Sequence, residues 1–196
     1  MLEFDWPTFI LNLTDDFAAF ERQFFMLSAL VGGMLSPLSL WGYVSRKKNP
    51  YKEDLGIGGL AGQQIFCAFL IFPMIYLDAG VVSFHGESVS ASVGDYTNGI
   101  ASMSQDDALT ASFYSALVLL GYFSAMSSAW SGYSAAGEAS APKKKELWLK
   151  CFFKYVGAVL CISMESFIEM FKAGYVTPAM VSVEFDIAKE FLVRFV

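Results

Sequence analysis

Residues 24–84 read FFMLSALVGGMLSPLSLWGYVSRKKNPYKEDLGIGGLAGQQIFCAFLIFPMIYLDAGVVSF, two long apolar runs joined by a short basic connector. No charged residue lies between Arg22 and Arg46, and none lies between Asp54 and Asp78. Each uncharged run has 23 residues. A helix of that length would measure about 35 Å, against a hydrocarbon core of about 30 Å. The stretch therefore predicts two membrane-spanning helices that form a hairpin.

The composition of the 196-residue chain favours the same interpretation, because 55% of its residues are hydrophobic and its mean hydropathy is +0.47. Eight of the 13 Lys and Arg residues fall in two windows, 46–52 and 143–150. Most carboxylates lie elsewhere. Basic clusters beside apolar runs are typical of cytoplasmic connectors. The net charge of −6 disfavours non-specific nucleic-acid binding by the whole surface.

The remainder of the chain repeats the pattern of an apolar run, a basic connector and a second apolar run. Residues 108–137 carry no charge, the run Lys143-Lys144-Lys145 follows, and charges interrupt a fourth apolar element over residues 147–171. We expect an all-α membrane protein with four long hydrophobic helices in two tandem hairpins, flanked by N- and C-terminal amphipathic helices. The predicted boundaries are 1–22 for the first amphipathic segment, 23–86 for the first hairpin, 87–107 for a linker, 108–172 for the second hairpin and 173–196 for the last amphipathic segment.

An internal repeat supports this division. A shift of 87 residues aligns Ser28-Ala29-Leu30-Val31 with Ser115-Ala116-Leu117-Val118, and it also aligns Asp78 with Glu165. Because each unit contains an even number of spans, the two units would have the same orientation in the membrane.

Three groups of residues are candidates for functional contacts. The basic loops would face lipid or a lumen through Arg46, Lys47, Lys48, Lys52, Lys143, Lys144, Lys145 and Lys150. Polar side chains expected inside the membrane are Asp78, Lys154, Glu165 and Glu169, which should avoid lipid and face protein, water or the headgroup level. Close helix packing is expected at Gly32, Gly33, Gly58 and Gly62.

The sequence does not resemble that of an enzyme. It has one histidine, no nucleophile motif and no zinc-ligand spacing, and its three cysteines are interpreted as small core residues. We therefore expect no catalytic residue, no metal and no cofactor, although the pattern allows a bound phospholipid.

The first unit resembles the IcmD/TraQ membrane proteins of type IVB secretion and IncI-type conjugation systems. The resemblance rests on an apolar run before Lys47-Lys48-Asn49-Pro50, the glycines at 56–59, and Phe72-Pro73 with Gly80, Phe84 and Gly86 at similar spacing. It covers residues 20–90, about a third of the chain. The helix, basic loop, helix plan is also similar to that of conjugative major pilins.

This resemblance implies a structural subunit of a conjugative type IV secretion system, pilin-like and able to assemble into a lipid-containing pilus or channel for DNA or protein transfer. The implied partners are further copies of the chain, as a homo-oligomer or helical filament, anionic phospholipid, and other secretion subunits; transported DNA would be met only indirectly. The implied location is the bacterial inner membrane with cytoplasmic basic loops, and an extracellular pilus after assembly. The alternatives are a passive membrane scaffold and a small transporter or ion pathway that uses Asp78 and Glu165.

Overall fold

The computed structural model describes residues 6–49, 56–85, 93, 96 and 104–168, and every regular element in this part of the chain is an α-helix. The helices are α1 (Trp6–Lys48), α2 (Gly56–Ile71), α3 (Pro73–His85), α5 (Gln105–Gly137) and α6 (Ala141–Ile162). The expected all-α fold is confirmed for these residues. Two segments, Ala19–Lys48 in α1 and Asp107–Gly137 in α5, are long and apolar enough to cross a membrane. These two candidate spans are what a membrane protein would have.

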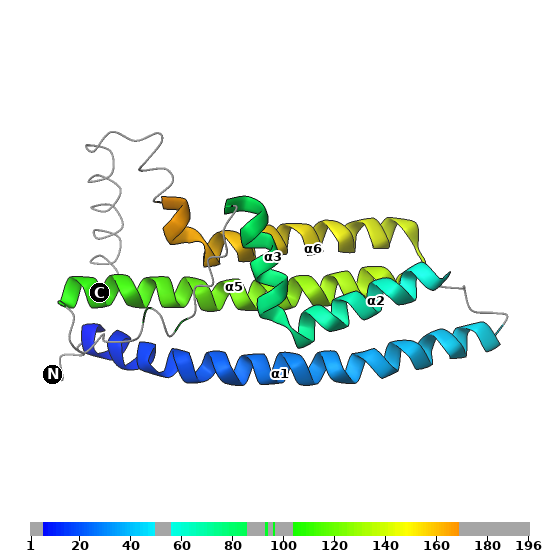
Figure 1. The fold of residues 1–196 in the computed structure, drawn as a ribbon, viewed down its shortest axis with the longest axis horizontal. Coiled ribbons are helices and arrows are strands. Elements are labelled where there is room, and N and C mark those ends of the chain that lie inside the picture. The colour runs from blue at the N-terminus through cyan, green and yellow to red at the C-terminus, as the bar shows by residue number, and fades with distance from the viewer. Residues whose placement is uncertain (1–5, 50–55, 86–92, 94–95, 97–103, 169–196) are drawn as a thin grey trace.

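The long helices lie side by side, as Figure 1 shows. α1 and α5 run in one direction, whereas α2 and α6 run in the opposite direction, and α3 crosses the bundle steeply. α6 packs along α5, and α2 packs against both α1 and α5. The C-terminus of α1 and the N-terminus of α6 consequently lie at the same end of the bundle (Figure 1).

The second expected span is broken. In place of one helix over residues 56–84, the structure has α2 and α3, which are bent by 97° at Phe72. Pro73 has no N–H to donate to the carbonyl of Phe69, so the helical hydrogen-bond ladder is interrupted there. The arrangement of four long helices in two tandem hairpins is therefore not confirmed.

The other expected boundaries differ from the helix ends. α1 is continuous from Trp6 to Lys48, so residue 22 lies inside a helix rather than between two. α6 begins at Ala141, before residue 147, and a turn at Ser163 follows Ile162 before residues 164–168 resume helical structure. The amphipathic helix expected over 173–196 lies outside the described residues, as does most of the linker.

The bundle core is made of aromatic and small side chains. Tyr76 stacks on Phe69 of α2 and on Tyr155 of α6, with ring centroids 4.3 and 4.4 Å apart. Phe24 of α1 meets the ring of Phe123 of α5 edge-on at 4.6 Å. These contacts join α3 to α2 and α6, and α1 to α5.

Two of the four glycines expected at helix contacts lie there. A Cβ on Gly32 would be 2.7 Å from the carbonyl oxygen of Cys67, and one on Gly62 would be 3.0 Å from Cβ of Ala136. A Cβ on Gly33 or Gly58 would meet no heavy atom within 4 Å. Close helix packing within one chain therefore accounts for the glycines at positions 32 and 62 only.

Candidate functional site

The two basic clusters lie at one end of the bundle. Arg46, in the last turn of α1, donates from Nη1 to the carbonyl oxygen of Gly137 at 3.4 Å. The guanidinium therefore contacts the last residue of α5, where helical carbonyls have no intrahelical donor and where a positive charge is favoured. The Nζ atom of Lys47 lies 5.1 Å from the ring centroid of Tyr43 in a cation–π contact.

The rest of the basic set is largely accessible. Lys48, Lys143, Lys145 and Lys150 are exposed and Lys144 is half-buried, whereas Lys52 lies outside the described residues. Because so many ammonium groups stay in contact with solvent or headgroups, this end of the bundle, formed by residues 46–48 and 143–145, is a cationic surface. We call it the basic end.

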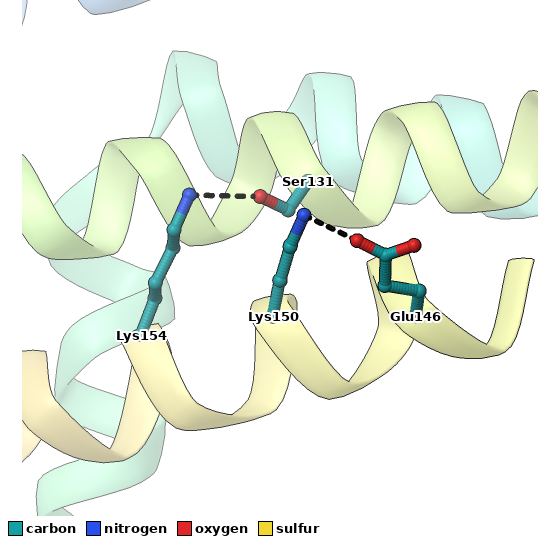
Figure 2. Close-up of polar contacts among 4 residues, drawn as sticks. All are labelled: Ser131, Glu146, Lys150 and Lys154. Carbon is teal, nitrogen blue, oxygen red and sulfur yellow. Dashed lines mark hydrogen bonds and ion pairs between the residues drawn. The ribbon is translucent and has the colours of Figure 1, made fainter. Parts of the chain in front are cut away.

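Lys150 has an ionic partner on its own helix. Its Nζ lies 2.6 Å from the Glu146 carboxylate, one turn away, and Figure 2 shows the pair on α6. The hydrogen bond and the charge of Lys150 lower the pKa of Glu146 below its ordinary value. Both side chains are exposed, so the pair contributes little to stability.

Lys154 lies one turn further along α6 and points toward α5 (Figure 2). Its Nζ donates to Oγ of Ser127 at 2.7 Å and to Oγ of Ser131 at 3.2 Å. The side chain is half-buried. The expectation that this polar group avoids lipid by facing protein agrees with these two contacts.

Two further serines of α5 hold the backbone of α6. Ser124 donates to the carbonyl oxygen of Lys154 at 2.8 Å, and Ser128 donates to that of Cys151 at 2.7 Å. The hydroxyls of Ser128 and Tyr76 are 3.1 Å apart, which brings α3 into the same network. In the described part of the chain every buried side-chain nitrogen or oxygen has a hydrogen-bond partner.

A smaller polar contact joins α1 and α2. The Gln64 amide hydrogen-bonds to the hydroxyls of Ser36 and Ser39, and Ser28 donates to the carbonyl oxygen of Leu70 at 2.6 Å. The sequence interpretation did not identify any of these serines as contacts. The available signal was their spacing: serines three, four or eight residues apart lie on one helix face.

The carboxylates expected inside the membrane have separate surroundings. Asp78 is half-buried on α3. Glu165 is exposed and accepts a hydrogen bond of 2.7 Å from the hydroxyl of Tyr96, whereas Lys154 bonds to α5. Glu169 lies outside the described residues. Lys154 and Glu165 thus have different hydrogen-bond partners.

The outer side of the bundle is apolar. On α1 the large exposed side chains recur every three or four residues, and the most exposed of them, Trp41, keeps 76% of its surface. Among them are Met26, Leu27, Leu30, Met34, Leu38 and Trp41. A helix face of this length and character matches contact with lipid chains.

Among the described residues, no group of three or more His, Cys, Asp or Glu side chains is placed to hold a metal ion. Compared with known protein families, curated proteins and solved structures, the chain has no significant match. The resemblance to IcmD/TraQ proteins therefore rests on the motifs of residues 20–90 and stays a prediction.

Proposed function

We propose that the chain is a structural, non-enzymatic membrane subunit of a conjugative type IV (IVB-like) secretion system, and that it assembles with further copies in a pilin-like manner. The observation that carries the proposal is the placement of both basic clusters at one end of a bundle whose outer side is apolar. Arg46 of α1 touches the end of α5, so the cluster of each unit belongs to a single surface. Such a surface would bind anionic headgroups, with about 1 kcal/mol for each Lys or Arg near them.

The proposed location follows from the same polarity. Clustered Lys and Arg favour the cytoplasmic side of an inner membrane. The opposite end of the bundle, where α1 and α5 begin (Figure 1), carries the exposed carboxylates of Asp16 and Asp107. In an assembled pilus or channel the basic end would face a lumen or bound phospholipid, and it would reduce the repulsion met by transported DNA without binding it directly.

The proposal is tested by changing the charge of the basic end. We expect that replacing Lys47, Lys48 and residues 143–145 with glutamine abolishes conjugative transfer while the chain still inserts in the membrane. Exchanging Glu146 and Lys150 is the matched control, because it keeps the net charge and the ion pair of α6. Transfer frequency is measured beside membrane fractionation and electron microscopy of filaments sheared from the cell surface. Unchanged transfer in the glutamine variant would refute the proposal.

The alternative function is a small transporter or ion pathway that uses Asp78 and Glu165. The break between α2 and α3 favours it, since discontinuous helices line the binding sites of many transporters. Under this alternative, Asp78→Asn combined with Glu165→Gln would abolish ion flux in proteoliposomes. Flux that persists in the double variant would remove the alternative.

A further inference from the structure

Lys154 carries a positive charge that nothing in the described part of the chain neutralises. Both of its acceptors, Ser127 and Ser131, are neutral hydroxyls. The carboxylate of Glu146, two turns away on α6, is paired with Lys150. An ammonium group has three donors, so one of those on Lys154 is left for another acceptor. An unneutralised cation in an apolar bundle is costly, and such groups mark functional sites.

The depth of this ammonium group can be estimated along α5. The candidate span of 31 residues is about 46 Å long, so a centred span would exceed a 30 Å hydrocarbon core by about 8 Å at each end. Ser131 is six residues from the end of α5, or about 9 Å, and Ser127 is about 15 Å from it. Lys154 bridges these two hydroxyls, so its Nζ lies at or just inside the boundary between headgroups and acyl chains.

Exposed aromatic side chains lie close to the ammonium group in the sequence of both helices. Ser127 is half-buried and Ser131 is buried, and Trp130, which lies beside both of them on α5, keeps 50% of its surface. Next to Lys154 on α6, Phe153 keeps 68%. The half-buried lysine therefore bridges the seam between α5 and α6, with lipid-facing rings beside it on both helices.

We propose that Lys154 and the hydroxyls of Ser127 and Ser131 form a binding site for the phosphate of one lipid headgroup at the α5–α6 seam. Phosphate oxygens accept hydrogen bonds from ammonium and hydroxyl groups at once. The phosphate would bind at the inner edge of the headgroup layer, and the exposed rings of Trp130 and Phe153 would pack on its acyl chains. The site deepens the proposed function, because it rests on the chain being a lipid-contacting membrane subunit, and it is separate from the basic end.

The test is lipid retention by the full chain. Wild type, Lys154→Gln, Lys154→Arg and Lys150→Gln are reconstituted with phosphatidylglycerol, extracted in mild detergent and examined by native mass spectrometry. We expect wild type, Lys154→Arg and Lys150→Gln to retain one lipid, and Lys154→Gln to lose it at least tenfold. Lys150→Gln is the matched control, since it removes the same charge one turn away. Equal retention in Lys154→Gln and wild type, or equal loss in Lys150→Gln, would overturn the proposal.

A second variant and a competition complete the design. Ser127→Ala with Ser131→Ala keeps the charge and should reduce retention several-fold, so the proposal stays testable if Lys154→Gln does not fold. Excess inorganic phosphate should not displace the lipid; displacement would assign the site to free phosphate and refute a lipid site. Filament formation is scored separately, so a chain that retains the lipid but forms no filament would refute the pilin-like function and leave this site intact.

Discussion

Replacing Gly32 with alanine should weaken the packing of α1 on α2. The added Cβ would lie 2.7 Å from the carbonyl oxygen of Cys67 and 2.9 Å from both Cβ of Leu70 and Cγ1 of Ile71. Two of these atoms are backbone or directly attached to it, so relief requires a shift of the whole of α2. Overpacking of this kind lowers the free energy of unfolding by about 1–3 kcal/mol. The higher helix propensity of alanine offsets about 1 kcal/mol of this loss.

Gly33→Ala is the matched control, because its Cβ would meet no heavy atom within 4 Å. It gains the same propensity without a clash. The free energies of unfolding of the two variants should therefore differ by about 1–3 kcal/mol. Each 1.4 kcal/mol corresponds to about a tenfold change in the unfolding equilibrium constant. Unfolding by SDS in mixed micelles, followed by far-ultraviolet circular dichroism, measures it. Equal stability of Gly32→Ala and Gly33→Ala would refute the close contact of α1 with α2.

Two further predictions concern hydrogen bonds. Ser28→Ala should lower the free energy of unfolding by about 0.5–1.5 kcal/mol, since it removes the buried hydrogen bond to the Leu70 carbonyl oxygen. Ser115→Ala should lower it less, because that hydroxyl bonds within its own helix; equal losses in the SDS titration would contradict this difference. Lys150→Gln should raise the pKa of Glu146 toward its ordinary value of 4.5, because the lysine lowers it. In wild type the contribution of this ion pair to stability is complete above pH 4.5 and disappears as the pH falls through the lowered pKa of Glu146. If NMR titration of the Glu146 carboxyl gave the same curve in both proteins, the pair would not form.

The prolines show how far the sequence could predict the helices. Pro37 and Pro73 both remove one helical hydrogen bond, and both stand in apolar runs. α1 continues through Pro37, whereas the chain bends by 97° at Pro73. The bend is held from outside: Ser28 donates to the carbonyl oxygen of Leu70 before it, and the hydroxyl of Tyr155 donates to that of Tyr76 after it. These donors are 42 and 79 residues away in the chain, so local sequence carries no sign of them.

The internal repeat also shows that residues in equivalent sequence positions can have different hydrogen-bond partners. Ser28 and Ser115 occupy equivalent positions under the shift of 87 residues, and both are fully buried. Ser28 bonds across to α2, whereas Ser115 bonds to the preceding turn of α5. Similar residues in two apolar helices thus take different partners.

The sequence by itself determined the features that depend on composition and length. The uncharged run of 23 residues after Arg22 and the run of 30 residues after Asp107 predicted the long apolar helices α1 and α5. The basic clusters could also be placed at helix ends, since charge and hydrophobic length are read directly from the order of residues. Only the tertiary structure decided which polar groups meet. It directed Lys154 to two serines of α5 and Glu165 to Tyr96, because a side chain's partner depends on the rotation and register of whole helices, which packing sets.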